Sequence, residues 1–168
     1  MKLSIKQISL VVAAIALATG AWLALLPSQA APQVRFTTIK GETLTLADLR
    51  GKVVMVNFWA TDCVACVAEM PKFVAAWNKY HAQGFETIAV AMSYDPPNYV
   101  LDYAAKNRLP FKVALDPMGD VAKSFGDIRF TPTSFIIDRR GNIVQQYLGE
   151  PDFAQFHALL EARLKEPA

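Results

Sequence analysis

The stretch Phe58-Trp59-Ala60-Thr61-Asp62-Cys63-Val64-Ala65-Cys66 contains the only two cysteines of the 168-residue chain, with two residues between them. Cysteines three positions apart lie on one face of a helix, so their Cα atoms can come within the roughly 5.5 Å that a disulfide requires. We therefore expect a pair of thiols that forms and breaks a disulfide with little movement of the backbone.

The residues on either side place this pair at the start of a helix. Val53 to Trp59 has the length and the β-branched and aromatic content of a buried strand, and residues 64 to 83 follow a helical period. Cys63 then lies at a helix N-terminus, where a partial charge of about half an elementary charge favours the thiolate. We predict that Cys63 is the nucleophile. Cys66 begins an apolar stripe, so it should point inward as the resolving thiol.

Length and charge indicate one neutral domain. With residues 1–30 set apart, the rest of the 168-residue chain is about right for one domain with a single core. Lys and Arg number 17 and Asp and Glu 15, and without Lys2 and Lys6 the counts are 15 and 15. A folded part without net charge is not expected to bind nucleic acid.

The N-terminal segment, residues 1–30, is expected to be a membrane anchor or a signal sequence. Residues 8–26 form a run of 19 uncharged residues, and a helix of that length, at about 1.5 Å per residue, can cross a bilayer. Ser28-Gln29-Ala30 offers small residues for a signal peptidase, so cleavage is the alternative. Cleaved signals usually have apolar regions of only about 7–15 residues, which favours an uncleaved anchor with its N-terminus inside.

The rest of the chain alternates strands with helices, as is typical of an α/β fold. A hairpin with its turn at Gly41 comes first, and a second hairpin and a helix come last. The expected strands are 34–39, 43–46, 85–92, 111–115, 133–138 and 143–148, and the further expected helices are 96–107, 119–125 and 152–165.

Four motifs support a family resemblance over residues 34–165. They are Val56-Asn57-Phe58-Trp59-Ala60-Thr61 before the cysteines, Ala68-Glu69-Met70-Pro71 after them, Gly126 with Thr131-Pro132-Thr133, and Ile137-Asp138-Arg139-Arg140-Gly141. Together they resemble the membrane-associated, thioredoxin-like thiol:disulfide oxidoreductases of the TlpA/ResA type, found on the outer side of bacterial inner membranes. The resemblance implies a thioredoxin-like fold: a central mixed sheet flanked by helices, with an N-terminal hairpin and an extra helix and strand within residues 95–112.

The resemblance also implies roles for individual residues. Thr131-Pro132 should hold a cis peptide bond that faces the cysteines and pairs with an extended segment of a partner. Asn57 stands where thioredoxins carry a buried aspartate that helps to deprotonate the resolving thiol. Glu69, one helical turn after Cys66, is the expected substitute, because a partly buried carboxylate near a thiol raises the thiol's pKa and can relay its proton. The alternative for Glu69 is a solvated first-turn residue favoured by the helix dipole.

The motif differs from the family pattern beside each cysteine. Asp62 replaces the usual tryptophan before the first cysteine, and Ala65 replaces a frequent proline before the second. An anion beside Cys63 disfavours its thiolate, which would make the dithiol a better reductant. Capping of the helix by Asp62 is an equal alternative.

A docking surface for partner proteins is expected around the cysteines. Its predicted residues are Trp59, Asp62, Thr131 and Pro132. For Trp59, packing in the core is the alternative.

Several other functions are open alternatives to a reductase. A static disulfide would close too small a loop to stabilise the fold much. A metal site needs more ligands than the two thiols, and only His81 and His157 are left to supply nitrogen; copper delivery stays as the non-enzymatic alternative. Thiol peroxidases of this fold carry a proline and a threonine where Val56 and Ala60 stand here. A disulfide-forming oxidase is the runner-up, although residues 85–115 leave little room for the long helical insertion of the DsbA type.

The resemblance predicts an exported thiol:disulfide oxidoreductase that reduces oxidised cysteines of client proteins. Its domain faces the periplasm, either anchored to the bacterial inner membrane or released as a soluble protein. Because an oxidising compartment keeps exposed thiols as disulfides, a membrane carrier of thiol reductant is the expected electron donor. The clients would be apocytochrome c or the copper-site cysteines of cytochrome oxidase. The protein is expected to be a monomer with no cofactor and no metal.

Overall fold

The computed structural model describes residues 29–167, and its central strand is the one that precedes the cysteines. This strand, β4 (Val53–Trp59), pairs in parallel with β5 (Phe85–Ala91) and antiparallel with β7 (Thr133–Ile137). All seven residues of β4 are buried, because the strand has neighbours on both edges and cover on both faces. Its side chains alternate between two cores, with Val53, Met55 and Trp59 in one and Val54, Val56 and Phe58 in the other.

The sheet has eight strands in the order β1-β8-β7-β4-β5-β6-β2-β3. β4, β5 and β6 run parallel, and the other pairs are antiparallel, so the expected mixed sheet is confirmed. The remaining strands are β1 (Gln29–Ala30), β2 (Arg35–Thr38), β3 (Thr43–Thr45), β6 (Lys112–Leu115) and β8 (Asn142–Leu148).

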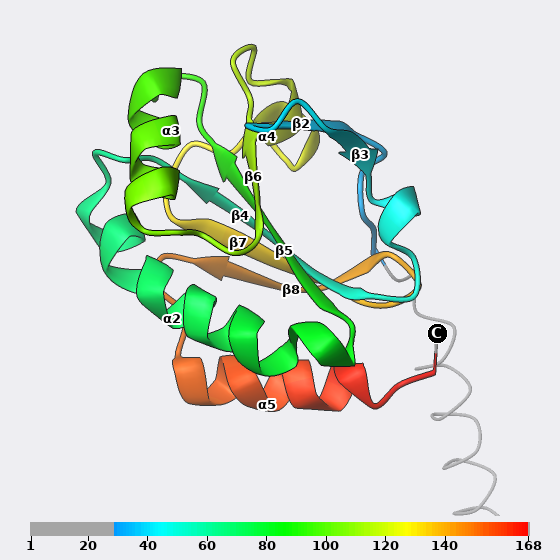
Figure 1. The fold of residues 1–168 in the computed structure, drawn as a ribbon. Helices are drawn as coiled ribbons and strands as arrows, with labels where there is room; N and C mark the ends of the chain where they lie inside the picture. The colour runs from blue at the N-terminus through cyan, green and yellow to red at the C-terminus, as the bar shows by residue number, and fades with distance from the viewer. Residues whose placement is uncertain (1–28, 168) are drawn as a thin grey trace, which may run out of the picture.

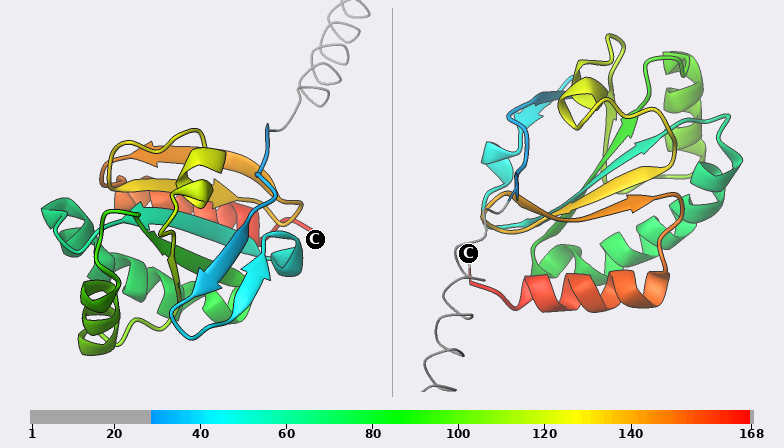
Figure 2. Two further views of the ribbon diagram at one scale, coloured as in Figure 1. Left: turned by 90° about the horizontal axis from the view of Figure 1, so that it is seen from above. Right: turned by 180° about the vertical axis from the view of Figure 1, so that it is seen from behind.

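Helices cover both faces of this sheet. α2 (Val64–Tyr80) and α5 (Phe153–Leu164) lie side by side on one face (Figure 1), where Phe73 and Phe156 pack with ring centroids 5.8 Å apart. α3 (Pro97–Lys106) adds Val100 and Ala104 to the same core. Figure 2 shows α4 (Asp120–Ser124) and the short helix η1 (Ala47–Leu49) across the sheet from α2 and α5. One further short helix, η2 (His81–Gln83), follows α2.

Two additions, the N-terminal hairpin and the segment of α3 and β6, extend the central fold beyond β5 at one edge of the sheet. β2 and β3 form the expected N-terminal hairpin, and β2 pairs with β6 rather than with the central strands. α3 and β6 are the expected extra helix and strand, inserted between β5 and α4. The loop that leads from β5 into α3 therefore emerges at the same end of the sheet as the loop from β4 into α2 (Figure 1), because β4 and β5 run parallel.

Strand β1 was not expected from the sequence. Gln29 and Ala30 pair with Ile143 and Asn142 of β8 at the edge of the sheet opposite the hairpin. Apart from these two residues, the expected anchor or signal segment, residues 1–30, lies outside the described residues. None of the helices in residues 29–167 is long and apolar enough to span a membrane.

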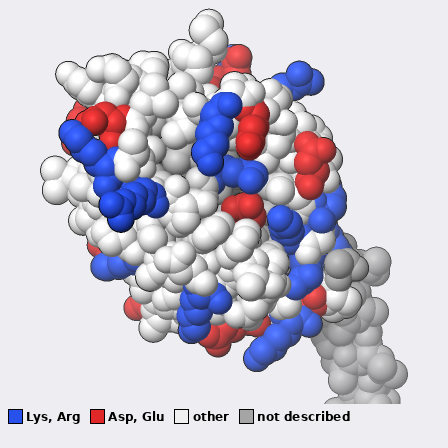
Figure 3. All heavy atoms as spheres, in the orientation of Figure 1, with Lys and Arg blue, Asp and Glu red and all other residues white. Residues whose placement is uncertain are grey.

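Charges on the visible surface are mixed in sign. On the face shown in Figure 3, basic and acidic side chains are interspersed, as the balanced counts of the two kinds of residue lead one to expect.

Candidate active site

The two cysteines form a disulfide at the junction of β4 and α2, with their Cα atoms 5.3 Å apart. Cys63 is the N-cap residue of α2, and its Sγ accepts a hydrogen bond from the Cys66 N–H at 3.2 Å. Cys63 is partly exposed, whereas Cys66 is fully buried. A partner's disulfide can thus reach the Cys63 sulfur but not the Cys66 sulfur. The predicted position of Cys63 at a helix N-terminus is confirmed.

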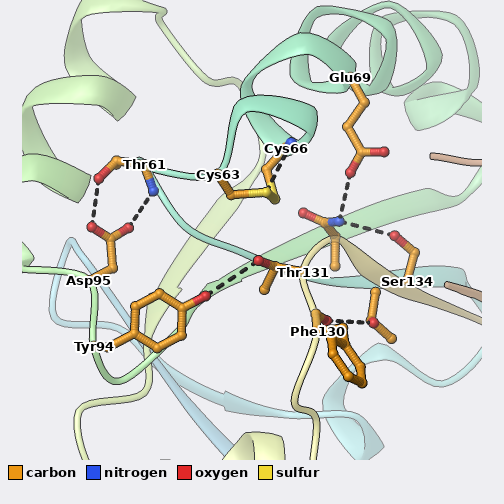
Figure 4. The surroundings of a disulfide bond; sticks show 11 residues. Thr61, Cys63, Cys66, Glu69, Tyr94, Asp95, Phe130, Thr131 and Ser134 are labelled. Atoms are coloured by element: carbon orange, nitrogen blue, oxygen red, sulfur yellow. Dashed lines mark hydrogen bonds between the residues drawn. A yellow bond between two sulfur atoms is a disulfide. The ribbon is translucent and has the colours of Figure 1, made fainter. Parts of the chain in front are cut away.

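The loop before β7 lies beside the cysteines. The Thr131-Pro132 peptide bond is cis, as the resemblance implied. Pro132 is buried and Thr131 is partly exposed, and the Thr131 Oγ1 lies 3.3 Å from the hydroxyl of Tyr94. Figure 4 shows Thr131 among the groups that surround the disulfide.

Trp59 is a core residue, so the expected docking role for it is wrong. Its side chain is fully buried, and its ring packs against Tyr103 of α3 with centroids 5.2 Å apart. The cause is its position in a central strand that is covered on both faces, at this point by Tyr103 of α3.

Asp62 does not cap α2. The N-cap is Cys63, and it is the Cys63 sulfur that accepts the hydrogen bond from the first turn. Asp62 precedes the cap and is exposed, so the capping alternative is wrong. Its negative charge stands next to the exchange site.

Glu69 lies in a buried polar cluster on the face of the sheet that α2 covers. Its side chain is fully buried, so the alternative of a solvated glutamate is wrong. The Asn57 Nδ2 donates one hydrogen bond to Glu69 Oε1 at 3.3 Å and another to Ser134 Oγ at 3.0 Å. Glu69 extends from α2, Asn57 from β4 and Ser134 from β7, so the cluster joins three elements. Figure 4 shows Glu69 and Ser134 on one side of the disulfide.

Burial makes Glu69 a weak acid. Removal from water raises the pKa of its carboxyl from 4.5 to about 8, against the opposing effect of the Asn57 hydrogen bond. Lys72 and Glu150 form an ion pair nearby. The charge of Glu150 raises the pKa of Glu69 further, and the charge of Lys72 lowers it. Glu69 is therefore mostly protonated at neutral pH and can release a proton slightly above it, in the range where thiols ionise.

Sequence reasoning missed two polar residues of this site, Asp95 and Ser134. The Asp95 carboxylate accepts hydrogen bonds from the N–H and the hydroxyl of Thr61, in the loop before Cys63. Asp95 and Ser134 lie 34 and 77 positions from their partners. No local spacing signals such contacts, because only the sheet brings the residues together.

Large apolar side chains near the disulfide are exposed. Val64 is 84% exposed, Phe130 77% and Tyr94 57%, and Figure 4 shows Tyr94 and Phe130 near Thr131, in the surroundings of the disulfide. Exposed aromatic groups in the neighbourhood of a reactive disulfide are suited to contact with a protein partner.

Within residues 29–167, no group of three or more His, Cys, Asp and Glu side chains is arranged to hold a metal ion. The Cys63–Cys66 disulfide itself can exchange with a thiol of another molecule.

Comparisons with known proteins point to the same thiol–disulfide chemistry as the geometry of this site. Residues 26–160 match the family model described as Redoxin. Thiol-disulfide oxidoreductase ResA from Bacillus thuringiensis subsp. konkukian is 35% identical over 131 residues, which are 78% of this chain and 75% of that protein.

Solved structures give the same result for the fold. A candidate thioredoxin from Neisseria meningitidis has a TM-score of 0.77 at 36% identity and covers 83% of this chain and 93% of its own. A thiol:disulfide interchange protein of the thioredoxin family from Chlorobium tepidum TLS has a TM-score of 0.75 at 27% identity, over 82% of this chain and 97% of its own. The expected thioredoxin-like fold is confirmed.

Proposed function

Because this chain belongs to the Redoxin family and is a thiol-disulfide oxidoreductase related to ResA, we propose that it acts outside the cytoplasm as a reductase of client disulfides. The observation that supports this proposal best is the asymmetry of the cysteine pair. The Cys63 sulfur is reachable at a helix N-terminus, and the sulfur bonded to it belongs to the buried Cys66. The Cys63 thiol can then attack the client disulfide, and the Cys66 thiol can resolve the mixed disulfide that results.

The proposed reaction has two exchange steps. The Cys63 thiolate attacks one sulfur of a client disulfide, forms a mixed disulfide and releases the first client thiolate. The Cys66 thiolate then attacks the Cys63 sulfur, which restores the Cys63–Cys66 disulfide and releases the second client thiolate. Two electrons pass to the client, and the released thiolates take up two protons. The protein ends oxidised, so a donor must reduce it before the next cycle.

We propose that Glu69 accepts the proton of the buried Cys66 thiol. Cys66 must lose its proton before it attacks, and it is shielded from water. Glu69, three positions later on α2 and fully buried, has a carboxyl pKa of about 8, close to that of an ordinary thiol. A base and an acid of similar pKa exchange a proton at small cost in either direction.

The proposed docking surface consists of Thr131, Pro132 and Asp62, together with the exposed aromatic groups Tyr94 and Phe130. The aromatic groups offer apolar contact area. The backbone of Thr131 offers hydrogen bonds to an extended client segment, as in the thioredoxin-like proteins that the chain resembles, whereas Pro132 has no N–H and its carbonyl already accepts from the Gly149 N–H.

Export and the electron supply are part of the same proposal. The uncharged run at residues 8–26 behind two lysines supports a membrane anchor, or a cleaved signal, that places the domain in the periplasm. In an oxidising compartment the dithiol is lost unless it is renewed, so we propose a membrane carrier of thiol reductant as the donor. Client cysteines of apocytochrome c or of the copper site of cytochrome oxidase, which must be reduced before their cofactors attach, fit this chemistry.

The reduction potential of Cys63–Cys66 tests the direction of electron flow. For the full chain equilibrated against thiol buffers, we expect a value near or below that of thioredoxin, about −270 mV. A value near about −120 mV, that of a strong oxidant, would instead make the protein a donor of disulfides.

The charge of Asp62 is expected to shift this potential. In Asp62→Asn the Cys63 thiolate is no longer repelled, so the dithiol form gains stability and the potential becomes less negative. The shift should be small, about 10 mV, since Asp62 is exposed and its charge is screened. Asp152→Asn, which removes an exposed acid at the N-terminus of α5, is the matched control and should leave the potential unchanged. Equal potentials for wild type and Asp62→Asn would rule out the electrostatic role.

A further inference from the structure

A buried carboxylate from the extra segment holds the loop that leads to Cys63. Asp95, only 5% exposed, accepts hydrogen bonds from the Thr61 N–H at 2.7 Å and from the Thr61 hydroxyl at 2.6 Å. Its own N–H donates to the Met92 carbonyl at 3.0 Å, so the carboxylate is fixed from the end of β5. Figure 4 shows the two hydrogen bonds side by side next to the disulfide.

We propose that Asp95 is a positioning residue for Cys63, which acts through Thr61 to hold the nucleophilic sulfur in its N-cap geometry. This inference rests on the proposed exchange function and adds a residue outside the Cys-x-x-Cys motif to it. It also gives the extra helix and strand a part in the reaction, because Asp95 lies on the loop that begins this insertion.

The loop between β4 and Cys63 is short, which explains how Asp95 can affect Cys63 without touching it. Three residues, 60–62, separate the end of β4 from Cys63. The Cys63 N–H donates to the Ala60 carbonyl at 3.3 Å, so Thr61 lies inside a closed turn. A displacement of Thr61 must therefore move Cys63, and with it the hydrogen bond that the Cys63 sulfur accepts from the Cys66 N–H.

The strength of the contact is adequate for this role. Both hydrogen bonds end on one ionised carboxylate, and charge-assisted bonds of this length are stronger than neutral ones. The hydrogen bond to the Cys63 sulfur favours the thiolate over the thiol. Loss of the contact between Thr61 and Asp95 with the Asp95 carboxylate kept, as in Thr61→Val, should consequently raise the pKa of the Cys63 thiol, and not only loosen the fold.

A second contact of the same loop supports the inference. Tyr94, the neighbour of Asp95, lies with its hydroxyl 3.3 Å from Thr131 Oγ1. Two adjacent residues of the loop between β5 and α3 thus form hydrogen bonds, one to the loop before Cys63 and the other to the loop of the cis proline. The loop between β5 and α3 connects the two sides of the exchange site.

The test compares substitutions at both ends of the contact in the full chain. Thr61→Val removes the hydroxyl donor without a change of charge, and Asp95→Asn removes the carboxylate. The Cys63 thiol pKa is read from the pH profile of its alkylation in the reduced protein. For Thr61→Val we expect a raised thiol pKa and a several-fold slower exchange at neutral pH, which recovers at alkaline pH. Thr61→Ser, which keeps both donors, should match the wild type.

The double variant and a matched control separate positioning from general stability. Thr61→Val combined with Asp95→Asn should exchange no more slowly than the slower single variant, because both break one contact. Asp116 is the control: it is 4% exposed and accepts hydrogen bonds from the Val121 and Ala122 N–H groups at 3.1 and 2.8 Å, next to α4. Asp116→Asn should lower stability and leave the thiol pKa and the exchange rate unchanged.

The inference is overturned if folded Thr61→Val has the wild-type thiol pKa and exchange rate. If Asp95→Asn does not fold, the comparison of Thr61→Val with Thr61→Ser still decides. A failure of the proposed function gives a different result, since the wild type itself would then not reduce a protein disulfide.

Discussion

Cys63→Ser is expected to lose all disulfide exchange, down to the background rate without protein. The serine hydroxyl is not ionised near neutral pH, whereas the Cys63 sulfur lies at a helix N-terminus that favours the thiolate. Cys66 cannot take over, because its side chain is fully buried. The measurement is the reduction of insulin disulfides by the full-length protein with dithiothreitol as the electron source. Appreciable turnover by Cys63→Ser would show that the wrong thiol has been assigned as the nucleophile.

Cys66→Ser is the matched control, with the opposite outcome. It keeps the attacking thiol and loses only the resolving one, so the first exchange step occurs and the second does not. A mixed disulfide with the client should then accumulate and be visible on a non-reducing gel, and added reductant should release it. If the adduct forms with Cys63→Ser instead, the order of the two thiols is reversed.

Glu69→Gln is expected to remove a large pH dependence of stability. The folded state holds the Glu69 proton up to a pKa of about 8, whereas the unfolded chain releases it near 4.5. Between these values the folded state binds more protons, so the free energy of unfolding falls as pH rises, by up to about 1.4 kcal/mol per pH unit. Stability from the neutral carboxyl is complete below pH 4.5 and is lost as pH rises through about 8. Glutamine is neutral throughout and lacks this slope.

Urea denaturation of the oxidised proteins between pH 5 and 9 measures the effect. Relative to the wild type, Glu69→Gln should gain stability from pH 5 to about 8, and the difference should level off above that pH. Glu86→Gln is the control, because Glu86 is also buried, at 4% exposed, but pairs with Lys112 at 3.5 Å. This variant keeps Glu69 and should keep the wild-type slope between pH 5 and 8. Parallel curves for the wild type and Glu69→Gln would contradict the raised pKa.

Most of the fold could be predicted from the sequence because its signals are local. The apolar run before the cysteines and the helical period after them predict β4 and α2, and the turn at Gly41 predicts the hairpin of β2 and β3. The disulfide follows from the same short stretch, since a helix sets the distance between Cys63 and Cys66. The cis proline followed from the family resemblance alone.

The parts that were missed depend on residues far apart in the chain. Asn57 and Glu69 could each be singled out, but Ser134 joins them only through the pairing of β7 with β4. The burial of Trp59 likewise depends on α3, which begins 38 residues later and supplies Tyr103. A strand as short as β1 has no sequence period from which to predict it.

Strand β1 gives a structural reason to distinguish the anchored form from a processed one. Gln29 and Ala30 cover part of the free edge of β8, and an uncovered edge presents unpaired N–H and C=O groups to other chains. Cleavage after Ala30 would detach this strand and leave the bond from the Ala31 N–H to the Gly141 carbonyl, at 3.0 Å, as the first contact of the new terminus. The uncleaved chain keeps Asn142 and Ile143 of β8 paired, and a chain cut at Ala30 would expose these two positions of the edge as well.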